Sequence, residues 1–231
     1  MYTQLEIESH LDGKLLIAYI NDDKTFNSLN KTTLSELKTF VHDGSRDQNV
    51  RCLAISGRGK AFCSGQNLKE AMTFSDPDED RIIQRIVIDY YNPLVKEIAH
   101  ARKPVISLVN GPAVGAGAML ALICDFTLAT KSSYFSQAFV NIGLIPDTGG
   151  TYWLPKLLGR QQANYLAFTG KKISAKEAKD LGLIADVFED ENFVQNAMEV
   201  LEQISNLPTK AISLTKKAFN ESYDNTLTQQ L

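Results

Sequence analysis

The sequence predicts an α/β fold in which short parallel strands alternate with helices. Three observations support this: apolar, strand-like runs recur at 51–56, 105–109 and 126–129, apolar stripes at helical spacing lie between them, and glycine-rich turns follow the strands. The units read as strand, strand, helix, which indicates a spiral of ββα units. With 231 residues, of which 44% are hydrophobic and 22% are charged, the chain can bury one sizeable core.

The first third of the chain predicts a hairpin, a helix and one further strand. Apolar residues alternate or run together on both sides of Asp12-Gly13, a pair typical of tight turns between strands. Leu34, Leu37 and Val41 recur at helical spacing and predict a helix. In chain order, we expect strands at 3–9 and 14–20, a polar loop at 21–27, a helix at 30–41, a strand at 51–56, a turn at 57–60 and a short helix at 68–73.

A long helix is expected over 80–101, because apolar side chains recur there on one stripe. Pro93 lies inside this stretch and predicts a kink or a break, since proline lacks the N–H group of a regular helix. The acidic segment 76–80 carries nothing apolar to anchor it and predicts a solvated loop. A strand at 105–109, an Ala-rich helix at 118–124 and a strand at 126–129 follow.

The last third of the chain is predicted to be mainly helical. Residues 159–170 carry a helical pattern, and Ser174 with Glu177 matches the S-x-x-E capping box that opens a helix. Two amphipathic helices are expected, over 192–205 and 209–223. The chain is expected to divide into a core, residues 1–190, and a C-terminal helical region, residues 191–231.

Composition and charge exclude several classes of partner. The net charge of −3 and the isoelectric point near 5.7 show no excess of positive charge, which binding to nucleic acid or to an anionic membrane surface would require. No apolar run approaches the roughly 18 residues of a membrane span, and the first residues do not resemble a secretion signal. Cys52, Cys63 and Cys124 lack C-x-x-C spacing and are expected to be reduced core thiols of a cytoplasmic protein.

Two glycine turns follow strand-like runs and are candidates for chemistry. One is Ser64-Gly65-Gln66, and the other reads N-G-P-A-V-G-A-G over 110–117 and opens an apolar helix. Such turns present free backbone N–H groups, and two donors from separate loops suit a thioester carbonyl that becomes an enolate. Neither turn has the sequence of a phosphate-binding P-loop or of a dinucleotide fingerprint. The glycines equally allow a structural reading, in which they only permit tight turns and close packing.

Five segments together resemble the crotonase superfamily, the enoyl-CoA hydratases and isomerases. They are A-F-C-S-G-Q-N-L at 61–68, the glycine turn at 110–117, C-D at 124–125, G-L-I-P-D-T-G-G-T at 143–151 and I-S-A-K-E-A-K-D-L-G-L-I at 173–184. They cover nearly the whole chain in the order of the family. The resemblance implies a crotonase-like spiral core, a C-terminal helical trimerisation region, a homotrimer or hexamer, acyl-CoA thioester substrates, and neither a prosthetic group nor a metal.

The resemblance also assigns catalytic roles. The oxyanion donors would be the backbone N–H groups of Gln66 and Ala116, whereas the two glutamates of the hydratases would fall at Met119 and Phe139 and are missing. Asp147 stands where single-acid isomerases of the family carry their base, and its segment looks most like the phenylacetate-pathway members that isomerise an epoxide-bearing phenylacetyl-CoA. We therefore expect a proton shuttle, in which Asp147 removes a proton next to the thioester and returns it two carbons away.

Asp147 has a structural alternative, because aspartate is a favoured helix N-cap. Gly150 follows at the third helical position, so no reciprocal capping box supports that role. An N-cap bonded to several N–H groups would have a low pKa, which would make it a weak base.

Substrate contacts are inferred from the resemblance. Coenzyme A would lie against Ser28, Ala61, Ser64, Gly65, Asn67 and Leu68. Lys24 is the candidate phosphate cation, with Arg58 and Lys60 as alternatives, and the other reading of each is a solvated surface charge. Apolar side chains would keep the site dry or simply pack in the core, and Asn141 is a candidate for orienting Asp147 or a ring oxygen. These apolar candidates are Phe74, Met119, Phe139 and Ile142.

Three functions follow from these residues. The favoured one is an isomerase that uses Asp147, and the second is a hydratase, a lyase in which Asp147 alone steers water. The third is a crotonase-fold protein that binds an acyl-CoA or another protein without catalysis. Family members usually continue past the position of Leu231, so we expect this C-terminal region to be truncated relative to the family.

Overall fold

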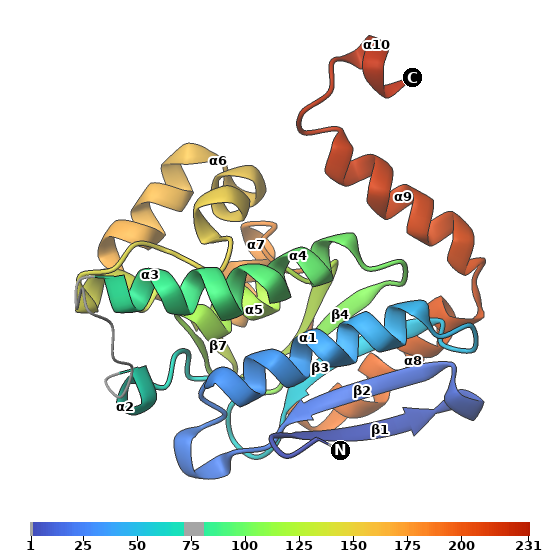
Figure 1. The fold of residues 1–231 in the computed structure, drawn as a ribbon, viewed down its shortest axis with the longest axis horizontal. Coiled ribbons are helices and arrows are strands. Elements are labelled where there is room, and N and C mark those ends of the chain that lie inside the picture. Colours follow the sequence, from blue (N-terminus) through green and yellow to red (C-terminus); the bar gives the residue numbers. More distant parts are fainter. Residues whose placement is uncertain (1, 72–80) are drawn as a thin grey trace.

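The computed structural model describes residues 2–71 and 81–231, and the fold within them is α/β, as predicted (Figure 1). Its larger sheet has the strand order β1-β2-β3-β4-β6-β9. β1 and β2 form the predicted antiparallel hairpin, and the other neighbours in this sheet are parallel. The strands are β1 (Leu5–His10), β2 (Leu15–Ile20), β3 (Cys52–Gly57), β4 (Val105–Val109), β6 (Phe126–Thr130) and β9 (Asp186–Phe188).

A smaller sheet, with the order β5-β7-β8, was not predicted. Its strands are β5 (Ala113–Val114), β7 (Tyr134–Ser136) and β8 (Lys172–Ser174). Strands of two or three residues are too short to show a period in sequence, so only their pairing partners define them. β5 pairs with β7 and lies inside the second glycine turn, so this sheet fixes that turn in space.

Helices cover both faces of the larger sheet. Leu53 and Ile55 of β3 belong to the apolar cluster of α1, whereas Cys52 and Ala54 belong to the cluster of α8. The central strands are therefore apolar on both sides, which explains why they read as continuous apolar runs. The helices of the first part of the chain are α1 (Lys31–Arg46), α2 (Leu68–Ala71), α3 (Ile82–Ile86), α4 (Asn92–His100) and α5 (Ala116–Leu122). Those of the second are α6 (Gly150–Thr169), α7 (Ala175–Asp180), α8 (Phe193–Asn206), α9 (Thr209–Glu221) and α10 (Leu227–Gln230).

The first predicted helix ends later in the structure than expected. α1 continues to Arg46, beyond the predicted end at Val41, because the buried Gly44 and Ser45 extend its packed face. α2 is described over Leu68–Ala71. The rest of the helix predicted over 68–73, Phe74 and the expected acidic loop at 76–80 lie outside the described residues.

The long helix predicted over 80–101 is interrupted just before Pro93. α3 and α4 are joined by a π-helical turn at Val87–Tyr91, and Pro93 stands in the first turn of α4. A proline leaves one carbonyl of the preceding turn without its usual donor, and the wider turn absorbs this mismatch. The kink predicted from Pro93 therefore takes the form of a π turn.

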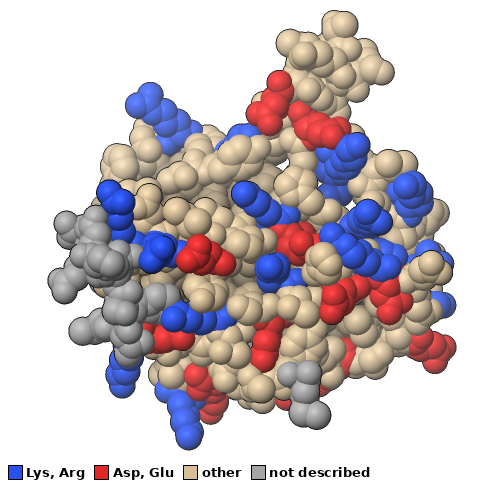
Figure 2. All heavy atoms as spheres, in the orientation of Figure 1, with Lys and Arg blue, Asp and Glu red and all other residues tan. Residues whose placement is uncertain are grey.

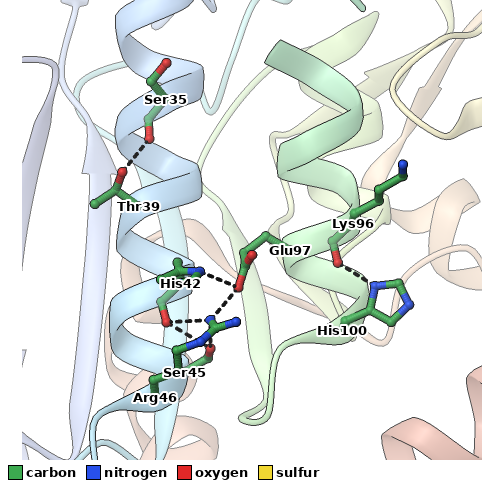
Figure 3. Close-up of polar contacts among 8 residues, drawn as sticks. All are labelled: Ser35, Thr39, His42, Ser45, Arg46, Lys96, Glu97 and His100. Carbon is green, nitrogen blue, oxygen red and sulfur yellow. Dashed lines mark hydrogen bonds and ion pairs between the residues drawn. The ribbon is translucent and has the colours of Figure 1, made fainter. Parts of the chain in front are cut away.

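A polar cluster ties α1 to α4 on the protein surface (Figure 3). Glu97 of α4 accepts a hydrogen bond from Arg46 Nη1 at 2.7 Å and lies 3.3 Å from His42 Nδ1, both on α1. Burial alone would raise the pKa of Glu97, but Arg46 and His42 more than offset this and lower it. The contacts of Glu97 with Arg46 and His42 therefore hold α1 and α4 together.

The C-terminal third is mainly helical, as predicted. α6 already begins at Gly150, and its regular φ/ψ values are broken at Gly159, where φ is 69° and ψ is 163°. The capping box of Ser174 and Glu177 is present at the start of α7. α8 packs on the sheet, whereas α9 leads away from it and α10 lies at the far end (Figure 1).

α9 is joined to the body by polar contacts. Lys216 Nζ donates to the Ile98 carbonyl at 2.8 Å and pairs with Asp125 at 2.9 Å. A cavity of about 560 Å³ lies between α9 and the body, and Asp125 faces it. On the face shown in Figure 2, basic and acidic side chains are interspersed.

Candidate active site

The two glycine turns meet each other, as the sequence suggested. Gly65 has a φ of +96°, and a Cβ built there would lie 2.8 Å from Val114 O and 3.6 Å from Ala116 N. Only glycine combines this left-handed conformation with such close approach. The loop that carries Gln66 therefore passes directly over the first turn of α5.

Two further glycines hold the same loops in contact. A Cβ at Gly117 would lie 2.3 Å from Cys63 O, and one at Gly111 would lie 2.3 Å from Lys60 O. The backbone joins the two loops as well, because Val114 N donates to Cys63 O at 3.0 Å. The structural role of the glycines is thus real, and it is what brings the two donor segments together.

The backbone N–H groups of Gln66 and Ala116 have no acceptor among the described residues. Leu29 N donates to Gly65 O and Asn67 N donates to Leu29 O, so the N–H of Gln66, between them, points to the other side. Ala116 is the first residue of α5 and follows Gly115, whose φ is 53°. A free N–H at the first turn of a helix is a donor reinforced by the helix dipole.

These donors border a cavity of about 220 Å³. Its described walls are largely apolar, with Ile83, Ile86 and Val87 on one side and Phe139 and Leu144 on another. The remaining described residues that line it are Ser64, Gly65, Gln66, Leu68, Tyr91, Val114, Gly115, Ala116, Ala138, Asn141, Ile142 and Asp147. Most of the residues predicted for the acyl end of the site therefore share one space.

Asp147 is the acidic residue of the described cavity walls. Burial raises the pKa of its carboxyl above the ordinary value, and the Thr148 hydroxyl, which donates to Oδ1 at 2.7 Å, lowers it in part. Thr148 is buried with a φ of +52°, an unusual conformation for a β-branched residue. Among the described residues, no backbone amide donates to this carboxylate.

The alternative role of Asp147 as a helix cap is wrong. The residue before α6 is Gly149, in the left-handed conformation, and no side chain caps the helix. Gly150 N donates to the backbone carbonyl of Asp147 at 2.8 Å and not to its carboxylate. The side chain is therefore available for chemistry.

Tyr91 is a cavity residue that the sequence analysis missed. It is 2% exposed, and its hydroxyl donates to Gln66 Oε1 at 2.6 Å. In sequence it lies beside the apolar stripe predicted for the long helix and not on it. The π turn that ends at Tyr91 is visible only in the structure.

Several predicted contact residues are placed outside the described cavity walls. Met119 is fully buried in α5, where its sulfur packs against the position of Gly150. Ser28 donates its hydroxyl to Thr25 Oγ1 at 2.8 Å, and Ala61 O accepts from the Asn27 side chain at 2.8 Å. Asn67 Oδ1 accepts from Glu70 N at 3.1 Å, which stabilises the start of α2. None of these four side chains lines the cavity within the described residues.

Comparisons with known proteins identify the family of the chain. The family model described as enoyl-CoA hydratase/isomerase matches residues 13–231. The chain belongs to the enoyl-CoA hydratase/isomerase family. The chain is 38% identical to a 1,2-epoxyphenylacetyl-CoA isomerase of Escherichia coli over 228 residues, 97% of this chain and 86% of the relative. It is 35% identical to a crotonyl-CoA hydratase of Syntrophomonas wolfei over 211 residues, 91% of this chain and 79% of the relative.

Solved structures show the same crotonase fold in this family. An enoyl-CoA hydratase from Bacillus anthracis superimposes with a TM-score of 0.89 at 29% identity, covering 99% of this chain and 86% of that one. One from Thermoplasma volcanium gives 0.89 at 30% identity, covering 98% and 87%. The family acts on coenzyme A thioesters. In the part of the chain that the structure describes, no cluster of three or more histidine, cysteine or acidic residues could hold a metal.

Of the cations expected near the coenzyme A phosphates in this family member, one is already engaged. Arg58 donates to Glu6 at 2.6 Å and to Glu8, and it stacks 3.6 Å from the ring centroid of Tyr19. Lys24, on a short turn at Asp23–Thr25, and Lys60 are exposed and lie outside the described cavity walls.

None of the helices in the described ranges is long and apolar enough to cross a membrane.

Proposed function

We propose that this family member is an isomerase that uses Asp147 as its single acid and base. The observation that carries the proposal is the composition of the described cavity walls: they hold one carboxylate, with a raised pKa, and the two free backbone donors. A carboxylate kept out of water accepts a proton more readily, and one such group suffices when the substrate stays in place.

The reaction would begin at the carbon next to the thioester. The N–H groups of Gln66 and Ala116 would donate to the thioester oxygen and stabilise the negative charge that develops there. Asp147 would remove a proton from C2 of a 3-enoyl-CoA, which gives a dienolate and a carboxylic acid. The same acid would return the proton to C4. The double bond would thereby move from its position between C3 and C4 to the position between C2 and C3, and the mass would not change.

The residues at the two glutamate positions of the hydratases support isomerisation over hydration. Met119 is fully buried, and Phe139 adds an apolar wall to the cavity. Neither side chain can activate a water molecule. Asn141 and Ile142 line the same space and would contact the acyl group, with Ser64, Gly65 and Leu68 closer to the thioester.

The acyl group and the phosphate contacts extend this proposal. The similarity to a 1,2-epoxyphenylacetyl-CoA isomerase supports a ring-bearing substrate, as in phenylacetate catabolism. With Arg58 held by Glu6 and Glu8, the exposed Lys24 and Lys60 remain as the candidate cations for the phosphates.

We also propose that the protein assembles as a homotrimer or hexamer through its C-terminal helices. Leu214 and Phe219 of α9 and Leu227 of α10 are 52%, 69% and 75% exposed, respectively, which supports a covering partner. Light scattering coupled to gel filtration would test this assembly.

Hydratase activity is the second candidate, because several relatives, such as the crotonyl-CoA hydratase, bear that name. Asp147 alone would then steer a water molecule to C3. The third candidate, acyl-CoA binding without catalysis, keeps the cavity but assigns no chemistry to Asp147.

One experiment separates these candidates. A 3-enoyl-CoA deuterated at C2 and unlabelled crotonyl-CoA would each be incubated with the wild type, with Asp147→Asn and with Asp180→Asn, an exposed control on α7. Chromatography with fragment mass analysis is expected to show a 2-enoyl-CoA that has gained no water and carries deuterium at C4, in the wild type and the control but not in Asp147→Asn. Addition of one water to crotonyl-CoA would favour the hydratase, and binding without reaction would leave the non-catalytic function.

A further inference from the structure

Tyr91 carries a hydroxyl group that packing alone does not explain. The residue is 2% exposed and lines the cavity, where a phenylalanine would fill the same space without a polar atom to desolvate. Its hydroxyl donates to Gln66 Oε1 at 2.6 Å. Because Gln66 also provides one of the two backbone donors, this contact joins the cavity wall to the oxyanion site.

We infer that Tyr91 is a positioning residue that holds the Gln66 side chain and thereby fixes the direction of the Gln66 N–H. This inference rests on the proposed function, in which that N–H stabilises the thioester oxygen. It adds a residue to the site that neither the glycine turns nor the position of Asp147 indicated.

The Gln66 side chain is held at both of its polar atoms. Oε1 accepts from Tyr91, and Nε2 donates to the backbone carbonyl of Asn67 at 3.2 Å. Because the phenol donates its proton, the amide atom that it contacts must be the oxygen. The amide nitrogen then donates to the backbone of the same loop, at Asn67. Since the backbone of this loop is already bonded to Leu29 on one side, the side chain supplies the attachment on the other.

The π turn is what aims Tyr91 at this loop. Val87–Tyr91 widens the helix by one residue, and Tyr91 is its last member. The extra residue rotates the side chains at the end of the turn by about 100° in total relative to a regular α-helix. π turns of this kind often mark functional positions in helices.

The electrostatic setting keeps Tyr91 a hydrogen-bond donor. Burial raises the pKa of its phenol far above the ordinary value, and the negative charge of Asp147 raises it further. The Tyr91 hydroxyl has one proton and donates it to Gln66, so it does not donate to Asp147. Among the described residues, the side chain that donates to the Asp147 carboxylate is Thr148. Tyr91 can therefore orient the donor loop without weakening the base.

The test is a double-mutant cycle of Tyr91→Phe and Gln66→Met, with Tyr134→Phe as a matched control. Tyr134 is a half-buried tyrosine of β7 outside the described cavity walls. We expect Tyr91→Phe to lower kcat about 10-fold with KM within about 2-fold, a smaller loss than that of a deleted oxyanion donor. Gln66→Met should lower kcat similarly, and the double variant should lose no more than either single one, because both remove the same contact.

Two results would overturn the inference: a kcat of Tyr91→Phe equal to that of Tyr134→Phe, or losses that multiply in the double variant. Gln66→Met keeps the test decisive if Tyr91→Phe does not fold, since a wild-type kcat in Gln66→Met would refute the same contact.

A binding measurement separates this inference from the isomerase proposal. A 2,4-dienoyl-CoA absorbs at longer wavelength when its thioester oxygen is hydrogen-bonded, and the shift needs no turnover. If the wild type does not isomerise any enoyl-CoA but shifts the spectrum, and Tyr91→Phe reduces the shift, the proposed function fails and the role of Tyr91 stands. If the shift is equal in both proteins, or is missing from the wild type, the role of Tyr91 is refuted.

Discussion

Gly117→Ala would place one methyl group where the two donor loops touch. Gly117 lies in α5 without a positive φ, so alanine suits its backbone and improves helix propensity by about 0.5–1 kcal/mol. The obstacle is steric: the new Cβ would lie 2.3 Å from Cys63 O and 2.8 Å from Cys63 C. Real Cβ atoms essentially never approach closer than 3.0 Å, so the backbone must move by at least about 0.7 Å.

Overpacking of this kind costs roughly 1–3 kcal/mol, and the obstacle here is a backbone carbonyl that cannot rotate away. With the cost taken near the upper end of this range, about 3 kcal/mol, the gain in helix propensity leaves a net loss of about 2 kcal/mol. This corresponds to a fall in Tm of about 4–8 °C for a chain of this size. The displaced Cys63 precedes Ser64-Gly65-Gln66, so the N–H of Gln66 would move as well. A misplacement near 1 Å can reduce kcat about 100-fold.

Gly44→Ala is the matched control. Gly44 is also helical, and its Cβ would lie 2.6 Å from Leu53 Cδ2, the end of a side chain that can rotate. Thermal unfolding followed by circular dichroism, together with the isomerase assay, should therefore show a much smaller loss of Tm and full activity in this variant. Equal Tm values for the two variants, or unchanged activity in Gly117→Ala, would refute the reasoning about the donor loops.

Three other predictions follow from charges and burial. Activity needs ionised Asp147, so it should fall as pH drops through the raised pKa of that carboxyl; Thr148→Ala removes a hydrogen bond that lowers the pKa and should shift the acid limb to higher pH, whereas Thr148→Ser should not. Lys216→Met leaves the Asp125 carboxylate without its cation and should lower the free energy of unfolding by about 1–3 kcal/mol, as measured by thermal unfolding. This value is below that of a fully buried ion pair, because Asp125 faces a cavity. The double variant Lys216→Met with Asp125→Leu should recover part of the lost stability. Burial raises the pKa of the Cys63 thiol to about 12, so iodoacetamide at pH 8 should leave it unmodified in the folded protein and label it after unfolding.

The local pattern of the sequence predicted most of the larger sheet and the helices that cover it. The hairpin of β1 and β2, the strands β3, β4 and β6 and the capping box at Ser174 all follow from periodicity or from a short motif. Strands buried on both faces must be apolar throughout, and such runs are visible without any knowledge of their partners. The smaller sheet escaped prediction because its strands are defined only by pairing with distant segments.

The candidate site divides in the same way. Local order in the sequence pointed to the two glycine turns, whereas the resemblance to the crotonase superfamily pointed to Asp147 and to the apolar residues at the glutamate positions. Only the tertiary structure decided that Gly65 passes over Ala116, that Asp147 does not cap α6, and that Tyr91 reaches Gln66 across 25 positions of the chain. The physical reason is that a side chain's neighbours across the fold determine its burial, its hydrogen bonds and its pKa, and these neighbours are set by packing rather than by local sequence.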